Sequence, residues 1–252
     1  MPRADAFEAT PAALNAWRAV EAQHVVATRA LVDTLAEQEQ LERILEGSKP
    51  PLPQPIARLH WLLFTPFRYA PPPTGSRFRA RHDPGVFYAA EEIRTACAEL
   101  GYWRWRHLLE SPQLTEIPQR PQTVFQTAVA GSTVDLREPP WVRQRKKWVD
   151  PSDYRACQEL ASRARSASVA MLRYESVRDP DRGGCVAVLD PAAFSRPKPM
   201  LQETWLLSVT RQRVTWVRSD ALRPARYEFE AAAIADWATG PALESPAKPF
   251  AS

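Results

Sequence analysis

The stretch FRYAPPPTGSRFRARHDPGVFYAAEEIRTACAEL (residues 67–100) decides how this sequence folds. Within it, GVFYAA (85–90) is a short apolar run rich in aromatic residues, which predicts a buried strand. EEIRTACAELGYWRW (91–105) follows, and its apolar residues recur on one face of a helix. Two glutamates stand at its start, where the helix dipole favours negative charge. We therefore predict a proline-rich loop, a buried strand and an amphipathic helix, in this order.

Several other segments alternate between apolar and polar residues, as strands do. HWLLFTPFRYA (60–70) is predicted as a strand, and QTVFQTAVAGSTVDL (122–136) as two strands separated by a turn at Gly131-Ser132. A hairpin is predicted for residues 168–191, with RDPDRGG as its turn. ETWLLSVT (203–210) and RVTWVRS (213–219) predict two more strands close together.

Two further segments have the spacing of helices. Residues 10–47 carry apolar side chains three, four and seven positions apart, between a Thr10-Pro11 start and a Gly47 stop. They predict one long helix or two, which would be either an arm for dimerisation or partner docking, or a layer covering the main domain. Residues 150–166 predict another helix, with Ser152 or Asp153 near its N-cap.

Helices and strands are mixed without strict alternation, which predicts an α+β fold with a mixed or antiparallel sheet. We expect a helical extension and proline-rich linker over residues 1–55 and one main domain over 56–238. The tail 239–252 is rich in proline and alanine, and we expect it to be disordered.

The composition excludes several classes of protein. With 44% hydrophobic and 25% charged residues, the 252-residue chain can build a packed core. Its net charge of +4 suits an anionic ligand or an acidic partner, but it is too small to argue for nucleic acid alone. Three scattered cysteines without a CxxC motif argue against a disulfide framework or a zinc site. No signal sequence and no membrane-spanning run is apparent, so we expect a cytoplasmic protein.

Common catalytic motifs are absent from the sequence. There is no GxxxxGK[ST], GxGxxG, HExxH or GxSxG, and the four histidines lack the spacing of metal ligands. If the protein is an enzyme, its chemistry must therefore come from arginines, tyrosines and a carboxylate.

The opening stretch resembles the RES family of bacterial toxins. Arg68-Tyr69 stands at the family's first arginine, and Gly75-Ser76-Arg77-Phe78 stands where the family has a Gly-Gly-Arg-Trp-Asn-like segment. Val86-Phe87-Tyr88 matches the family's short strand ending in tyrosine. Glu99 follows Tyr88 by eleven positions (99 − 88), on the predicted helix.

A second block carries the serine of the family. Arg173-Tyr174-Glu175-Ser176 is followed by the apolar run 184–189, so the resemblance spans roughly residues 58–220. Phe78-Arg79 departs from the family's Trp-Asn, which leaves Arg79 and Arg81 as alternatives to Arg77. The N-terminal segment has no counterpart in the compact members of the family.

The resemblance implies a fold related to the ADP-ribosyltransferases and NAD as a substrate, without a metal. It implies toxicity by hydrolysis or phosphorolysis of NAD, or by ADP-ribose transfer, and neutralisation by a helix-turn-helix antitoxin. By the same resemblance, Glu99 and Arg77 are the expected catalytic residues. The residues expected to bind NAD are Arg68, Tyr69, Tyr88 and Ser176.

The chemistry of NAD agrees with this set of residue types. Nicotinamide is already a cationic leaving group, so breaking its bond to ribose needs a negative charge near the oxocarbenium-like centre, which Glu99 can supply. Guanidinium groups such as those of Arg68 and Arg77 match pyrophosphate oxygens. Tyrosine rings can stack on nicotinamide or adenine. Ser176 could orient Glu99 or the ribose hydroxyls through a hydrogen bond.

Alternatives of other classes stay open at this point. The protein could transfer ADP-ribose to a protein instead of degrading NAD. The basic and aromatic run Trp141–Trp148 could make it a nucleic-acid-binding protein, whose binding would weaken with salt and survive Glu99→Gln. An interaction protein with an inactive site is a further alternative. If the protein is a toxin, we expect it to contact nucleic acid only through the antitoxin and to have no membrane partner. A homo-oligomer is compatible with this interpretation.

Overall fold

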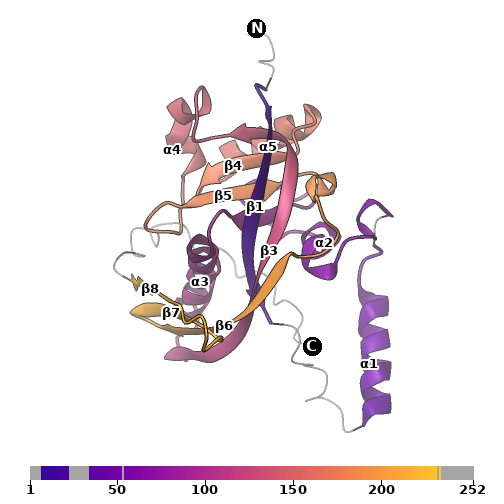
Figure 1. Cartoon of the computed structure of the whole chain (residues 1–252), viewed down its shortest axis with the longest axis vertical. Helices are drawn as coiled ribbons and strands as arrows, with labels where there is room; N and C mark the ends of the chain where they lie inside the picture. The colour runs from indigo at the N-terminus through magenta and orange to yellow at the C-terminus, as the bar shows by residue number, and fades with distance from the viewer. Residues whose placement is uncertain (1–6, 23–33, 53, 232, 234–252) are drawn as a thin grey trace.

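A computed structural model describes residues 7–22, 34–52, 54–231 and 233 of the chain (Figure 1). The strands of this part are β1 (Thr10–Glu21), β2 (Phe87–Ala90), β3 (Glu116–Asp135), β4 (Met171–Glu175), β5 (Gly184–Val188), β6 (Leu201–Thr210), β7 (Arg213–Arg218) and β8 (Arg226–Glu230). The α-helices are α1 (Leu35–Ser48), α2 (Trp61–Arg68), α3 (Ile93–Leu109), α4 (Arg145–Trp148) and α5 (Arg155–Ser166). Short 3₁₀ helices cover Gln54–Ile56, Trp141–Gln144 and Pro191–Ala193.

The strands form one mixed sheet in the order β1-β2-β5-β4-β3-β6-β7-β8, and β1 also pairs with β3. Five strands therefore close into a ring, in which β1 joins β2 at a single pair, Trp17↔Ala90. The β3–β4 pair is parallel and the other pairs are antiparallel. This confirms the predicted α+β class with a mixed sheet.

The N-terminal segment is partly a strand. Thr10–Glu21 was expected to be helical, but it forms β1 and pairs with β3 over its whole length, from Thr10↔Thr133 to Glu21↔Gln122. Its two faces pack on different hydrophobic clusters, with Ala16 buried on one side and Trp17 on the other. The helix prediction is correct for Leu35–Ser48, whereas residues 23–33 and the tail 239–252 lie outside the described residues.

Two other predictions of strands need correction. Trp61–Arg68 is helix α2, whose N-terminus is capped by His60 Nδ1 accepting from Leu62 N at 3.3 Å. Leu62 and Leu63 are adjacent and both buried, which a helix face against the core allows and strand alternation does not. The expected turn at Gly131-Ser132 is absent, because β3 continues through both residues without interruption. A Cβ on Gly131 would lie 2.8 Å from Ala170 Cβ, so this glycine serves close packing.

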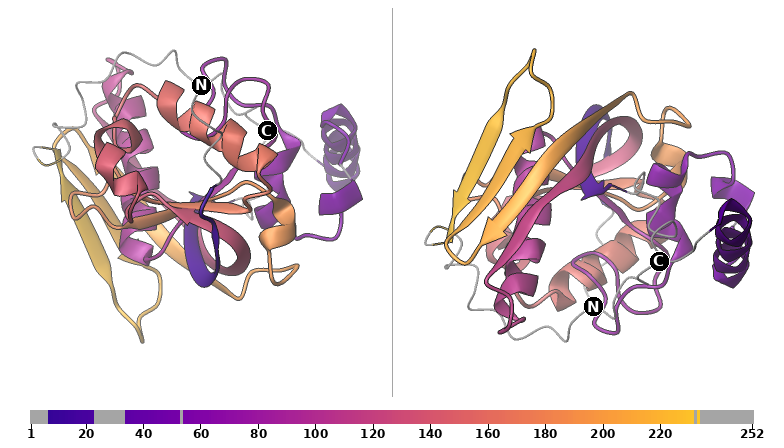
Figure 2. Two further views of the ribbon diagram at one scale, coloured as in Figure 1. Left: turned by 90° about the horizontal axis from the view of Figure 1, so that it is seen from above. Right: turned by 90° about the horizontal axis from the view of Figure 1, so that it is seen from below.

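The other predicted helices and strands agree with the structure. The strand and helix of the opening stretch are β2 and α3, residues 168–191 contain the β4–β5 hairpin, and β6 and β7 are neighbours. The helix predicted over 150–166 is α5, which begins at Arg155. Figure 2 shows α3 and α5 against the sheet, with α1 standing apart from it.

Three clusters of buried side chains hold these layers together. One lies between α5 and the β4–β5 hairpin, a second between α2 and the strands β2 and β5, and a third between α3 and the strands β6 and β7. Helix α3 belongs mainly to the third cluster and α5 to the first. Three of the functional residues expected from the sequence, Arg77, Glu99 and Ser176, lie close to one another in this part of the fold.

Candidate functional site

Glu99 on α3 meets the loop that leaves β4. Strand β4 ends at Glu175, so Ser176 is the first residue of the loop toward β5. Ser176 is fully buried, and its Oγ donates a hydrogen bond to Glu99 Oε1 at 2.6 Å. A hydroxyl–carboxylate bond of this length is charge-assisted. The fold thus joins two residues that are 77 positions apart in the sequence.

The other bonds of Ser176 determine which way its hydroxyl points. Its Oγ accepts hydrogen bonds from the backbone N–H groups of Arg178, at 3.1 Å, and Asp179, at 3.0 Å. A hydroxyl has two acceptor lone pairs and one proton. Since both lone pairs are used, the proton is directed at the Glu99 carboxylate, and the loop holds that carboxylate in one place.

The same loop is anchored to α3 one turn before Glu99. Asp179 is buried, accepts from Thr95 Oγ1 at 2.7 Å and forms an ion pair with Arg94. Arg94 also pairs with Asp181 at 2.9 Å. A Cβ on Gly183 would lie 2.0 Å from Thr95 Oγ1, so only glycine permits this close approach of loop and helix.

Arg77 is buried beside this cluster. Its Nη1 donates to the Trp148 backbone oxygen at 2.8 Å, and its guanidinium carbon lies 4.7 Å from the centre of the Tyr154 ring. Burial alone would lower the pKa of Arg77, but the nearby Tyr154 and Cys157, together with Tyr174 and Glu99, raise it above its ordinary value. Arg77 therefore stays charged within the field of Glu99.

The two alternatives to Arg77 lie elsewhere. Arg79 donates from Nε to the Asp83 backbone oxygen at 3.1 Å and lines a separate pocket. Arg81 is exposed. Of the three arginines left open by the sequence, the structure brings Arg77 to the Glu99 cluster.

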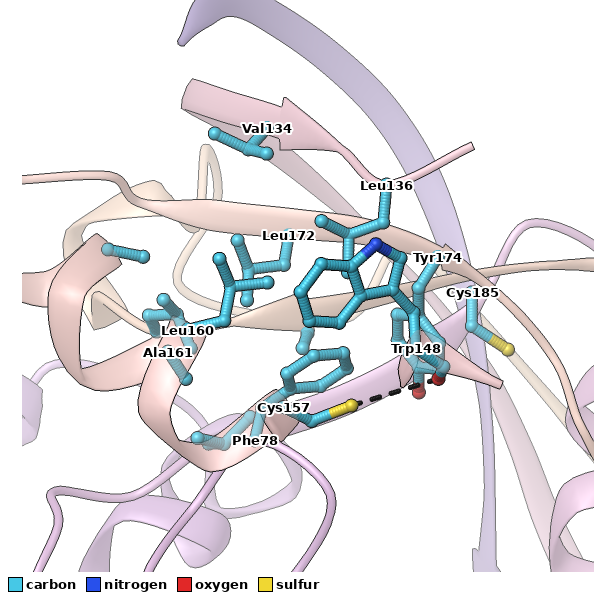
Figure 3. Close-up of a cluster of buried hydrophobic side chains, with 14 of the residues drawn as sticks. Phe78, Val134, Leu136, Trp148, Cys157, Leu160, Ala161, Leu172, Tyr174 and Cys185 are labelled. Carbon is cyan, nitrogen blue, oxygen red and sulfur yellow. Dashed lines mark hydrogen bonds between the residues drawn. The ribbon is translucent and has the colours of Figure 1, made fainter. Parts of the chain in front are cut away.

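Figure 3 shows the buried side chains that pack around Phe78, the residue after Arg77, and around Trp148, whose backbone oxygen binds Arg77. Phe78 is fully buried and meets Tyr174 edge to face, with 4.9 Å between ring centres. Cys157 Sγ lies 3.7 Å from the Trp148 backbone oxygen, which also accepts from Arg77. Burial raises the pKa of the Cys157 thiol, so it stays neutral.

Tyr88 and Tyr69 line a pocket of about 260 Å³ next to this cluster. The Tyr88 hydroxyl hydrogen-bonds to Ser76 Oγ at 2.8 Å and accepts from Phe78 N at 2.9 Å. Burial raises the pKa of Tyr88 to about 12, so its hydroxyl remains protonated. Tyr69 is 37% exposed at the pocket, which makes its ring accessible to a ligand.

Arg68 is the expected site residue that the structure leaves outside both groups. Its Nε donates to the Pro50 backbone oxygen at 2.7 Å, which ties the end of α2 to the preceding linker. The guanidinium carbon is 6.0 Å from the centre of the Tyr69 ring. Arg68 therefore lies near the Tyr69 ring but is not among the residues that line the pocket.

Three residues at these places are not among those predicted from the sequence. Tyr154 lies against Arg77, and Arg178 follows Ser176 by two positions in the same loop. Arg18 of β1 lines the Tyr69–Tyr88 pocket and donates to the Tyr88 backbone oxygen at 2.7 Å. Its segment was predicted as a helix, either a docking arm or a layer covering the main domain. The position of Arg178 beside the family serine was a signal available in the sequence.

Two structural features are absent from the described part of the chain. There, no group of three or more His, Cys, Asp or Glu side chains is arranged to hold a metal ion. Over the same residues, no helix combines the length and apolar character needed to cross a bilayer.

Comparison with known families places this geometry in context. The family model described as the RES domain matches residues 52–216, which include Arg77, Glu99 and Ser176. The chain therefore belongs to the RES domain family. No curated protein matches the sequence. Membership in this family is consistent with a toxin of a toxin–antitoxin pair that acts on NAD.

Proposed function

We propose that this protein is a toxin that breaks the nicotinamide–ribose bond of NAD, and that a cognate antitoxin neutralises it. The observation that carries the proposal is the part-buried 2.6 Å hydrogen bond from Ser176 Oγ to Glu99 Oε1. It supports the role of Glu99 because a carboxylate held in one position can stabilise developing positive charge without reorganisation during the reaction.

The proposed reaction needs one negative charge. The bond between ribose C1′ and the nicotinamide nitrogen breaks, and its electron pair returns to the ring, which leaves as neutral nicotinamide. Positive charge develops on the ribose, and the Glu99 carboxylate stabilises it. A new C1′–O bond then forms to water, which loses a proton, or to phosphate. The products are nicotinamide and either ADP-ribose or its 1″-phosphate.

Other residues are proposed to bind and orient the substrate. Arg77 supplies a buried positive charge beside Glu99, and the pocket of Tyr69 and Tyr88 offers aromatic surface to one of the rings of NAD. Ser176 acts through Glu99. Arg68 binds the Pro50 backbone oxygen through Nε and does not line the pocket, so we assign it a supporting role.

Helix α1 supports the proposal of a protein partner. It stands apart from the body in Figures 1 and 2, and its Leu35 and Ile44 are 75% and 60% exposed. Exposed apolar side chains on such a helix favour the docking-arm interpretation over a covering layer. We propose that the helix-turn-helix antitoxin binds to this helix.

The test is release of nicotinamide from NAD by the purified, partner-free protein, with and without inorganic phosphate. We expect Glu99→Gln to lower the rate at least a hundredfold, because it removes the charge and keeps the shape of the side chain. Glu159→Gln, an exposed position on α5, is the matched control and should keep the wild-type rate. Phosphate dependence would separate phosphorolysis from hydrolysis.

The outcomes exclude one another. No nicotinamide release by the folded wild type, or equal rates for wild type and Glu99→Gln, would contradict the proposal. Release that occurs only when a protein acceptor is added, with ADP-ribose attached to that acceptor, would identify a protein ADP-ribosyltransferase instead.

A further inference from the structure

Arg178 is a buried cation whose side chain is incompletely paired. The residue is 2% exposed, and its Nη2 donates to the Pro151 backbone oxygen at 2.7 Å and to Tyr154 Oη at 2.9 Å. Both acceptors are neutral. Its Nη1 is buried and has no hydrogen-bond partner among the described residues. A buried guanidinium N–H without an acceptor is unfavourable, and a ligand oxygen would satisfy it.

Arg77 and Arg178 share one tyrosine. Arg77 lies over the Tyr154 ring, whereas Arg178 bonds to the hydroxyl of the same residue. Arg77 also donates to the backbone oxygen of Trp148, the last residue of α4, and Arg178 to that of Pro151, in the segment that connects α4 to α5. Within the described chain neither arginine has a carboxylate within ion-pair distance.

Among the described residues, neither of the two buried guanidinium groups has a carboxylate bound directly to it. Asp179 adjoins Arg178 in sequence, but Arg94 and Thr95 already bind its carboxylate. Arg94 also binds Asp181, whose side chain is exposed, so the remaining negative charge of that group lies at the surface. An anion is the natural direct counterpart of a buried guanidinium group without a carboxylate partner.

The contacts of Arg178 indicate where such an anion would lie relative to Glu99. Its guanidinium carbon lies 4.0 Å from the ring centre of Tyr102 and 5.7 Å from that of Trp103. These two residues follow Glu99 by three and four positions on α3, so they share its helix face. The backbone N–H of Arg178 also donates to Ser176 Oγ, the atom that holds Glu99. An anion at Arg178 would therefore lie against the helix that carries Glu99.

We propose that Arg178, together with Arg77, forms a binding subsite for a phosphate-type oxyanion next to Glu99. Bidentate guanidinium donors suit the tetrahedral oxygens of this class of ligand. The oxyanion is either the pyrophosphate of the dinucleotide or free inorganic phosphate. The assignment to the dinucleotide rests on the proposed function, whereas the subsite itself does not.

The experiment measures binding by isothermal titration at constant ionic strength, with ADP-ribose and with inorganic phosphate as separate probes. We expect Arg178→Gln to weaken binding of at least one probe about tenfold to a hundredfold, the effect of losing a charged hydrogen-bond donor. Arg178→Lys, which keeps the charge and loses the planar fork, should fall between. The control is Arg182→Gln, an exposed arginine of the same loop, and it should bind both probes like the wild type.

The two probes separate the two sources. A loss confined to ADP-ribose identifies the pyrophosphate, and a loss with phosphate alone identifies a site for the free ion. The proposal is overturned if Arg178→Gln binds both probes as the wild type does, or if the wild type binds neither.

A measurement on the wild type covers the case in which the Arg178 variants do not fold. Binding of either probe should slow amide hydrogen exchange in residues 148–154 and 176–183, which surround the two guanidinium groups. Binding that leaves exchange in both segments unchanged would place the oxyanion elsewhere. None of these measurements depends on nicotinamide release. Oxyanion binding without NAD cleavage would therefore refute the proposed function and leave the proposed subsite intact.

Discussion

Replacing Ser176 with alanine removes one oxygen that three groups share. Ser176 Oγ donates to Glu99 Oε1 and accepts from the N–H groups of Arg178 and Asp179. The alanine variant keeps the backbone at the end of β4 but loses all three hydrogen bonds. The Glu99 carboxylate then loses its fixed partner, and two N–H groups in a buried loop lose their acceptor.

The size of the effect follows from the kind of bonds that are lost. A hydrogen bond to a charged group contributes about 1.5–3 kcal/mol and a neutral one about 1 kcal/mol. Since part of this is recovered by relaxation of the loop, we expect the free energy of unfolding to fall by about 2–4 kcal/mol. If the lost bond to Glu99 acts in the transition state, about 1.5–3 kcal/mol corresponds to a rate about tenfold to a hundredfold lower.

Urea unfolding followed by circular dichroism measures the first quantity, and nicotinamide release at saturating NAD measures the second. Ser176→Thr keeps the hydroxyl and should retain more of the activity than Ser176→Ala. Ser166→Ala, whose Oγ donates to the Ser162 backbone oxygen on the surface of α5, is the control. A folded Ser176→Ala variant with the wild-type rate of release would refute the view that Ser176 positions Glu99. If the variant loses stability but keeps the wild-type rate, the role of Ser176 is purely structural.

Two further predictions concern stability. Burial raises the pKa of Tyr88 to about 12 from an ordinary value of 10.0, so the folded state holds this proton more tightly than the unfolded state. The corresponding stability is present below pH 10 and is lost as the pH rises toward 12; unfolding titrations should show wild type losing about 2–3 kcal/mol more than Tyr88→Phe, and equal losses would contradict the assignment. Gly131→Val should lower the unfolding free energy by about 1–3 kcal/mol, because a Cβ there meets Ala170 Cβ at 2.8 Å. An unchanged urea midpoint would show that β4 can move aside.

Local sequence was enough for elements whose partners lie nearby in the chain. The strand–helix pair β2–α3 and the hairpin β4–β5 were predictable because apolar periodicity and turn residues act over short distances. Strand β1 could not be predicted, because the apolar residues of Thr10–Glu21 fit the spacing of a helix as well as that of a strand. Pairing with β3, more than a hundred positions later, stabilises the strand. Long-range pairing overrides local preference in such cases.

For the candidate site, too, the sequence predicted some features and only the structure showed the others. The order and spacing of Arg77, Glu99 and Ser176 could be recognised from the sequence because they follow a family pattern. Their meeting around one hydrogen bond could not, since it requires α3 and the β4–β5 loop to pack together. Arg68 lies outside both groups, with its Nε bound to a backbone oxygen of the linker, and its role in binding NAD stays a prediction.

By itself the sequence determined the class of fold, the family and the residue types available for chemistry, because these depend on composition and on patterns along the chain. Only the tertiary structure decided that β1 closes the ring of strands, and that Arg18 faces the Tyr69–Tyr88 pocket. It also brought the unpaired Nη1 of Arg178 beside the Glu99 helix. Burial and charge balance are properties of neighbours in space, and no local pattern in the chain encodes which neighbours those are.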